Sequence, residues 1–434
     1  MANSEKKLGL AEVTAIGIGG MIGGGIFAVL GLAIATAGHA VALTLAAGGV
    51  IALVTGLSYA HLGLAFRDDG GSFTYIEKAF AAPAIAGVAG WLLVAGYVGT
   101  LALYATAFGA YGATLFAGAG ASPWIADGLA IGVLSGFLAI NLIGAKLSGG
   151  VELGVVGVKL AILALFAVVG LIGVKASHFT PIFDQGYVTP LAAVALIFVA
   201  YEGFELIPNA VDEMDRPERN LKRALVLAIL ITAVIYVVVA IAAQGNLTPT
   251  QIQHDQEYVL AVAARPMLGE TGFILIGIAA LLSTASAINA TLFGAARLAM
   301  VMASEHALPR IFSRRERDKP IPYVALLVLS ALSGGFALTA ELSVISLFAS
   351  ATFLLIFAGV NFAAFRMARR IGMHPVLPLL GGGLSGASFL LLLWHSWDHN
   401  PGGLAWLAGF YAVAGALEGG LCWAKGARKM SNPA

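Results

Sequence analysis

Charged residues are scarce in this chain of 434 residues, since Asp, Glu, Lys and Arg together make up only 11% of it. A soluble domain carries charges on roughly a quarter of its residues, so the composition excludes an ordinary soluble protein. The formal net charge of +1 at pH 7 leaves no basic domain that would bind nucleic acid. A single cysteine, Cys422, excludes an intramolecular disulfide and a cluster of thiolate metal ligands.

Motifs of catalysis and cofactor binding are also missing. The sequence has no Walker motif, no catalytic triad and no flavin fingerprint, and its eight histidines do not follow the spacing of metal ligands. A glycine-rich segment at residues 17–27 follows no predicted strand, which excludes a nucleotide-binding loop there. The sequence therefore predicts neither an enzyme nor an ATP-driven pump, with no cofactor and no metal. The first apolar run is too long for a cleavable signal peptide, so we expect none.

Long apolar runs dominate the chain instead, because 59% of its residues are hydrophobic. A run of about twenty apolar residues is long enough to span a bilayer as a helix. We therefore predict an all-α membrane protein, a single domain over residues 1–434 with twelve transmembrane helices. The expected spans are 11–36, 41–65, 84–116, 124–145, 151–174, 189–211, 223–244, 270–302, 322–340, 343–365, 376–397 and 402–424.

The basic residues predict a topology. Nearly all of the 24 lysines and arginines fall in loops on one side of the predicted bilayer, whereas only Lys175 and Arg265 fall on the other. By the positive-inside rule, we expect both termini to be cytoplasmic and the protein to reside in the cytoplasmic (inner) membrane. The longest loop on the opposite side, residues 245–269, is either a gate or a passive connector.

The first span contains three consecutive glycines, Gly23, Gly24 and Gly25, at its midpoint. Each glycine is about 1 kcal/mol worse than alanine in a helix, and an unpaired backbone amide in lipid costs several kcal/mol. We therefore expect the helix to open here towards a polar cavity. The three amides would lie at the start of a second half-helix, where they suit an anion such as a carboxylate. The alternative is that the glycines only permit close helix packing.

The sixth span contains a similar interruption. Two carboxylates, Glu202 and Glu205, flank Gly203 inside an apolar run that ends near Pro208. Glycine and proline weaken a helix, and charged side chains at membrane depth normally face a cavity or a partner. The sequence therefore predicts a second broken span.

The two interruptions suggest an internal repeat. If residues 1–175 and 189–366 form two repeats of five spans each, the breaks occupy equivalent positions. The odd number of spans inverts the second repeat relative to the first, and residues 376–424 supply the last two helices. Paired interrupted helices are the best sequence indication of a transporter's binding site at the bilayer midplane.

Three segments resemble the amino acid–polyamine–organocation (APC) superfamily of transporters. Residues 20–27 look like its first-helix motif, residues 201–220 like its sixth helix and the loop that follows, and residues 283–297 like its eighth helix. The resemblance implies a leucine-transporter-type fold with 5+5 inverted repeats and discontinuous helices 1 and 6. The chain departs from the family pattern at Lys222, where proline is usual, and before Gly70, where a proline is missing.

The polarity of the half-helices predicts how an α-amino acid would bind. Its carboxylate would accept hydrogen bonds from the amides of the glycine triplet, and its ammonium would donate to carbonyls freed at the ends of the other half-helices. Aromatic residues and an asparagine nearby are candidates for the pocket wall or gate, or else for ordinary packing and an interhelical hydrogen bond. The candidate substrate-binding residues are Met21, Ile22, Gly23, Gly24, Gly25, Val199, Ala200, Tyr201, Glu202, Phe204, Tyr97 and Asn289.

Lys159 lies about eight residues, or roughly 12 Å, inside the fifth span. A lysine at this depth either snorkels to the interface or finds acceptors within the protein. In APC members that the chain resembles, a helix-5 lysine replaces the sodium ion that bridges helices 1 and 8 in sodium-coupled relatives. The resemblance implies that Lys159 donates to a carbonyl near Gly19 or Gly20, lies close to Ser283 and Ser286, and couples transport to protons.

The two carboxyl groups of the sixth span admit different roles. Glu202 lies in the expected break, where it would favour a substrate with a cationic side chain or an amine, or would pair within the protein. Glu205 is expected to accept a hydrogen bond from a freed amide or to pair with Arg297.

These observations predict a secondary transporter that moves an amino acid by alternating access, driven by protons or by exchange rather than by sodium. One alternative is a carrier of cationic amino acids or polyamines. Another is a transporter-like amino acid sensor, but the short tail after the last span argues against it. The expected partners are a small amino acid, the proton and membrane lipid, and the sequence does not indicate an oligomeric state.

Overall fold

The computed structural model of the chain describes residues 7–68, 70–118, 120–144, 149–315 and 321–431, apart from the side chains of residues 149–152, 249 and 421–431. Within these ranges the chain is helical, and its only β-type pairing is an isolated bridge between Leu8 and Met214. The α-helices and 3₁₀-helices (η), in chain order, are α1 (Leu10–Met21), α2 (Gly25–Ala37), η1 (Gly38–Ala40), α3 (Val41–Phe66), α4 (Gly71–Phe80), α5 (Pro83–Ala117), α6 (Pro123–Ile143), α7 (Gly149–Ile172), η2 (Ala176–Phe179), α8 (Thr189–Leu196), η3 (Phe198–Tyr201), η4 (Phe204–Glu213), α9 (Pro217–Asn246), α10 (Pro249–His254), η5 (Gln256–Tyr258), α11 (Val259–Ser304), η6 (Arg310–Ser313), α12 (Tyr323–Thr339), α13 (Leu342–Arg366), α14 (Val376–His399) and α15 (Pro401–Ser431).

The helices form one bundle that is suited to a membrane. In the described part of the chain, eight segments are long and apolar enough to cross a bilayer, and a ninth is the bent pair formed by α8 and the η helices after it. One of the eight segments joins α2 and α3. Two further helices, α1 and α12, are shorter but also apolar, and α15 is the last helix of the chain. Every one of the twelve predicted spans overlaps a helix of this set, which confirms the all-α membrane architecture.

Helix boundaries follow from local sequence. Proline occupies one of the first two positions of α5, α6, α8 and α9. Proline suits these positions because the first amides of a helix have no intrahelical acceptor. The span predicted at 270–302 begins where α11 bends, since Gly269 interrupts that helix with a φ of 63°.

The segment 245–269 differs from the long loop that we expected. It contains α10, η5 and the first turns of α11, and the residues from Val259 to Ala264 are buried. The backbone of Gln256 packs directly against Gly31 of α2. This segment is therefore a helical cover that is packed onto the second half of the first span.

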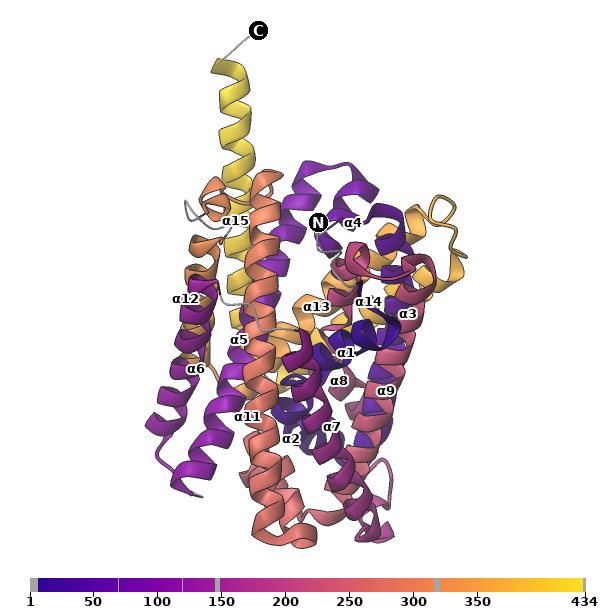
Figure 1. The fold of residues 1–434 in the computed structure, drawn as a ribbon, viewed down its shortest axis with the longest axis vertical. Coiled ribbons are helices and arrows are strands. Elements are labelled where there is room, and N and C mark those ends of the chain that lie inside the picture. Colours follow the sequence, from indigo (N-terminus) through magenta and orange to yellow (C-terminus); the bar gives the residue numbers. More distant parts are fainter. Residues whose placement is uncertain (1–6, 69, 119, 145–148, 316–320, 432–434) are drawn as a thin grey trace, which may run out of the picture.

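One end of the bundle carries α4 and the last turns of α15 (Figure 1). We call it the basic end, because Arg67, Lys78 and Arg366 lie there at the ends of helices. Arg67 and Glu218, at the start of α9, form an ion pair with an N–O distance of 2.6 Å. The pKa of Glu218 is lowered by its own backbone amide at the helix start and by Arg67.

The main chain before α1 is tied to the end of η4 at the same end of the bundle. The Leu8 amide donates to the Glu213 carbonyl at 2.8 Å, and the Asp215 amide donates to the Leu8 carbonyl at 2.9 Å. These two bonds connect the first and sixth spans, which are far apart in the sequence.

Candidate functional site

The first span is broken at the glycine triplet. Helix α1 ends at Met21, and α2 begins at Gly25 with Gly24 as its N-cap, which confirms the predicted break. The Gly23 amide donates to the Gly20 carbonyl at 3.2 Å, so it is occupied in this conformation. The amides of the first turn of α2 have no carbonyl to donate to within that helix, as at any helix N-terminus.

Each glycine of the triplet faces a different neighbour. A methyl group on the first would lie 2.6 Å from Cβ of Ala287 on α11, and one on the third would lie 2.7 Å from Cα of Ala200. A methyl group on the second, Gly24, would collide with the ring of Tyr104 on α5. The triplet therefore permits close approach of three helices, and the Tyr104 ring covers the backbone at the start of α2.

The sixth span is broken at the predicted place. Helix α8 ends at Leu196, and the helical pair that makes up the span is bent by 52°. Gly203 has a φ of 119°, a conformation that residues with a side chain rarely adopt. A methyl group on Gly20 would lie only 3.1 Å from Cα of Gly203, so the two broken segments touch through their backbones.

A tyrosine of α9 connects the carbonyls that the two breaks set free. The Tyr236 hydroxyl lies 2.6 Å from the Met21 carbonyl oxygen and 2.8 Å from the Ala200 carbonyl oxygen. A tyrosine hydroxyl has one proton, so the two acceptors share a single donor. We did not predict Tyr236, because nothing in the surrounding sequence distinguishes it from other membrane tyrosines.

Two serines of α13 also bind the open backbone near the sixth-span break. The Ser350 hydroxyl accepts from the Val199 amide at 3.0 Å and donates to the Leu196 carbonyl at 2.8 Å. Ser346 donates to the same carbonyl at 2.7 Å. These bonds satisfy backbone groups that a continuous helix would pair internally, and sequence reasoning missed both serines.

The two carboxyl groups of the sixth span lie close enough to interact with each other, and each also has a partner of its own. Glu205 accepts a hydrogen bond from the Gly203 amide at 2.7 Å, which confirms its expected role as partner of a freed amide. Glu202 is also buried, and the Tyr104 hydroxyl donates to its Oε2 at 3.4 Å. A carboxyl group thus lies at the break itself, beside the tyrosine that covers Gly24.

Lys159 is fully buried on α7. Its Nζ donates to the Gly19 carbonyl at 3.2 Å, which confirms the predicted contact and excludes snorkelling. The Gly19 carbonyl is open because the Gly23 amide binds Gly20 instead. A cation at the C-terminal end of a helix such as α1 is electrostatically favourable.

The surroundings of Lys159 are three packed helices. Helix α7 contacts both α1 and α11, and Figure 1 shows it lying between α9 and α11. On α11, Ser283 is buried and its hydroxyl has no hydrogen-bond partner among the described residues. Ser286 is half-buried. The proximity of these serines to the Lys159 ammonium stays a prediction.

The predicted aromatic gate residues are engaged in packing. Tyr201 donates to the Leu45 carbonyl at 2.6 Å, so its ring lies against α3. Phe204 packs on Phe357 with a centroid distance of 5.1 Å, and Tyr97 packs edge-on against Phe353 at 5.6 Å. In this conformation the packing alternative describes these side chains.

Asn289 lies on α11 and faces α6. Asn141 Nδ2 donates to Asn289 Oδ1 at 3.0 Å, which is the expected interhelical hydrogen bond. Asn289 is two positions beyond Ala287, the residue that faces the glycine triplet, and is therefore turned roughly 200° away from it on the helix. The structure does not bring Asn289 to the breaks.

The broken segments are closed to solvent. Met21, Ile22, Val199 and Ala200 have no exposed surface, so a ligand reaches them only after side chains move. Within the ranges that the structure covers, no group of three or more His, Cys, Asp or Glu side chains is arranged to hold a metal ion.

Comparison with known proteins agrees with this geometry. The family model described as amino acid permease matches residues 8–394. The chain belongs to the amino acid permease family. This places it in the APC superfamily, and its broken first and sixth spans fit the leucine-transporter-type fold. The family points to a multi-pass membrane transporter rather than to an enzyme.

Three curated relatives of this permease illustrate the range of the family. An uncharacterized protein of Methanocaldococcus jannaschii is 35% identical over 401 residues, which cover 92% of each chain. The branched-chain amino acid permease BcaP of Bacillus subtilis is 26% identical over 360 residues, which cover 78% of this chain and 76% of the relative. The vacuolar cationic amino acid transporter 8 of Arabidopsis thaliana is 28% identical over 421 residues, which cover 93% of this chain and 70% of the relative.

Proposed function

We propose that this permease transports an α-amino acid by alternating access and couples it to protons or to exchange rather than to sodium. The observation that supports this most directly is the contact between the two breaks, where one hydroxyl serves a freed carbonyl from each. Free carbonyl acceptors suit the ammonium of a zwitterion, and the start of a half-helix in the same place suits its carboxylate. Two relatives are named for the transport of amino acids, which supports the same substrate class.

Substrate binding would exchange partners within the closed site. The substrate ammonium would donate to the carbonyls of Met21 and Ala200 in place of the Tyr236 hydroxyl. The substrate carboxylate would lie at the start of α2, where backbone amides and the helix dipole favour an anion. The Tyr104 ring must first leave Gly24, because it covers that backbone.

Lys159 would supply the coupling. Its ammonium stabilises the end of α1 through the Gly19 carbonyl, in the place where a sodium ion would otherwise bridge helices. Loss of the proton would leave that carbonyl with a neutral and weaker donor. The stability of the α1 position would therefore depend on the proton, which is the requirement for coupling transport to pH.

Alternating access would use the two halves that the sequence predicts. We infer repeats over residues 1–175 and 189–366, each beginning with a broken span, with residues 376–424 outside them. We also infer that the basic end faces the cytoplasm of a cell bounded by an inner membrane, with both termini on that side.

A carrier of cationic amino acids or polyamines is a second candidate, and Glu202 favours it. This carboxyl group is buried beside the break, within 3.4 Å of the Tyr104 hydroxyl. A substrate with a second positive charge would provide the counter-charge that a buried carboxylate needs.

The test is a flux measurement with purified protein in proteoliposomes. Binding of all amino acids and of putrescine is first screened by thermal shift, and ligands that stabilise the protein are then tested for uptake with and without a pH gradient. We expect uptake of at least one amino acid that is stimulated by the pH gradient or by amino acid loaded inside the vesicles, and that is indifferent to sodium. Binding without flux in either direction would instead indicate a sensor, and dependence on sodium would contradict the proposed coupling.

A further inference from the structure

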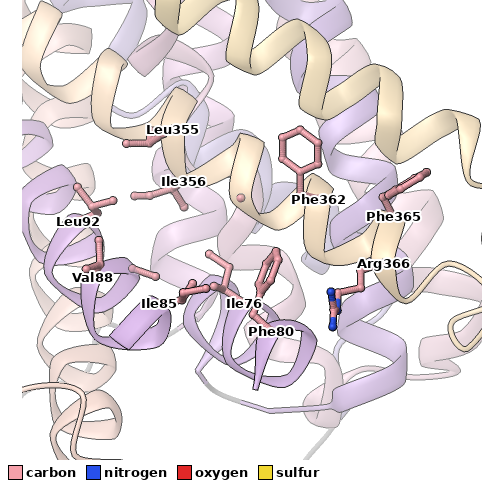
Figure 2. A pocket seen from close by; sticks show the side chains of 12 residues that line it. Ile76, Phe80, Ile85, Val88, Leu92, Leu355, Ile356, Phe362, Phe365 and Arg366 are labelled. Carbon is pink, nitrogen blue, oxygen red and sulfur yellow. The ribbon is translucent and has the colours of Figure 1, made fainter. Parts of the chain in front are cut away.

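A hollow lies at the basic end, away from the two breaks. It has a volume of about 640 Å³ and opens between α4, the start of α5 and the end of α13 (Figure 2). Pockets of roughly 300–1,000 Å³ are the size that holds small organic ligands. Its lining includes Ile76, Phe80, Val88, Leu92, Phe362 and Arg366.

The walls of the hollow are apolar and face outward from the bundle. Val88 is 42% exposed, Phe362 is 45% exposed and Phe365 is 42% exposed, although all three are large hydrophobic side chains. Exposed apolar side chains on membrane-spanning helices such as α5 and α13 are expected where a bilayer covers them. The hollow therefore opens towards the acyl chains of the membrane rather than towards water.

One cation stands at the end of this apolar hollow. Figure 2 shows the Arg366 guanidinium at its rim, next to the Phe80 ring, whose centroid lies 5.8 Å away. Among the described residues, no carboxylate lies within ion-pair distance of Arg366. The neighbouring Lys78, by contrast, pairs with Glu77 at 3.7 Å. Arg366 is thus the charged group at the hollow that is available to an outside anion.

An apolar hollow that ends at an unpaired guanidinium matches one class of molecule. We propose that it binds an anionic glycerophospholipid, with an acyl chain between α4, α5 and α13 and the phosphate at Arg366. Basic pockets between membrane helices on the cytoplasmic side suit anionic head groups. Arginine suits a phosphate because its planar guanidinium can donate two parallel hydrogen bonds. A free phosphate would use the cation but would leave the hollow empty.

The experiment is native mass spectrometry of the detergent-purified full chain. The protein is titrated with dioleoylphosphatidylglycerol or with dioleoylphosphatidylcholine, and the fraction that retains lipid is measured. Two variants test the two parts of the site: Arg366→Gln removes the charge, and Val88→Trp fills the hollow from an exposed position. The matched controls are Lys222→Gln, an exposed lysine at the same end of the bundle, and Val234→Trp, a 62% exposed valine on α9.

The native protein should retain phosphatidylglycerol in preference to phosphatidylcholine. Arg366→Gln should weaken phosphatidylglycerol binding by about fivefold, the effect of one basic group at an anionic membrane surface. It should weaken phosphatidylcholine binding less, because the choline ammonium already balances the charge of that phosphate. Val88→Trp should reduce the binding of both lipids, whereas the two controls should behave as the native protein.

Three results would overturn the proposal. The first is equal retention of the two lipids by the native protein, and the second is an unchanged preference in Arg366→Gln. The third is a protein dimer that carries no lipid and that Val88→Trp converts to monomer, since the hollow would then be filled by a second copy of the chain. Thermal unfolding in detergent shows that each variant is folded, and Arg366→Gln tests the site even if the tryptophan variant is not.

Discussion

Replacing Lys159 separates its two roles, the structural one at the end of α1 and the proposed one in coupling. Lys159→Ala removes both the hydrogen bond to the Gly19 carbonyl and the buried aliphatic stem. Lys159→Gln retains a side-chain donor, on a side chain one atom shorter, but carries no charge and does not titrate. The pair of variants therefore distinguishes a missing helix cap from a missing proton.

The magnitudes follow from the geometry. A hydrogen bond from a charged group contributes about 1.5–3 kcal/mol, and emptying the space of a large buried side chain costs about 2–5 kcal/mol. Lys159→Ala should therefore destabilise the protein by several kcal/mol, visible as a marked fall in the thermal midpoint. Lys159→Gln keeps a neutral bond worth about 0.5–1.5 kcal/mol, so its midpoint should lie much closer to that of the native protein.

The assay is amino acid uptake into proteoliposomes between pH 5 and pH 8, with a pH-sensitive dye inside the vesicles. We expect Lys159→Gln to bind substrate and to exchange it across the membrane, but to lose both the pH dependence of uptake and the accompanying proton flux. The same change at Lys175, an exposed lysine just beyond the end of α7, is the matched control and should leave both unchanged. A native pH profile and native proton flux in Lys159→Gln would refute the coupling role.

Three further changes test the site itself. Tyr236→Phe leaves the two freed carbonyls without their donor, at a cost of about 1–3 kcal/mol. The substrate-free protein should therefore melt at a lower temperature, and substrate should raise its thermal midpoint by more than it does in the native protein. An equal or smaller rise would show that the ammonium binds elsewhere. Gly24→Ala should destabilise the substrate-free protein because its methyl group meets the Tyr104 ring, and adding Tyr104→Ala should restore folding stability. The same methyl group should weaken substrate binding in isothermal titration by keeping the carboxylate from the backbone at the start of α2, so full binding by the single variant would contradict the proposed carboxylate site. If the substrate is cationic, Glu202→Gln should weaken the inhibition of uptake by arginine or putrescine far more than the inhibition by alanine. An equal effect on both kinds of inhibitor would show that Glu202 does not select the substrate.

The sequence predicted the breaks because their causes are local. Three adjacent glycines in an apolar run, and a glycine between two carboxylates in another, lower helix stability wherever the chain folds. The structure accordingly begins α2 at Gly25 and gives Gly203 a positive φ. The contact between Lys159 and Gly19 was expected from the resemblance to the APC superfamily, and the open end of α1 supplies the acceptor that a buried cation needs.

The partners of those breaks were not predictable from local sequence. Tyr236 and Ser350 belong to helices that look like ordinary membrane spans, and their role depends on which side of the helix faces the open carbonyls. The direction of a side chain around a helix is set by packing, which also turned Tyr201 towards α3 and Asn289 towards α6. When apolar residues surround a helix on every side, its sequence does not indicate which side faces the neighbouring helix.

The main-chain bonds of Leu8 have a mechanical consequence. They fasten the segment that leads into α1 to the end of η4, so swinging either half-helix outward on its own breaks two hydrogen bonds. A motion that carries both half-helices together keeps those bonds intact. A probe attached near residue 8 and another near residue 214 should thus hold a constant separation while the basic end of the bundle opens and closes.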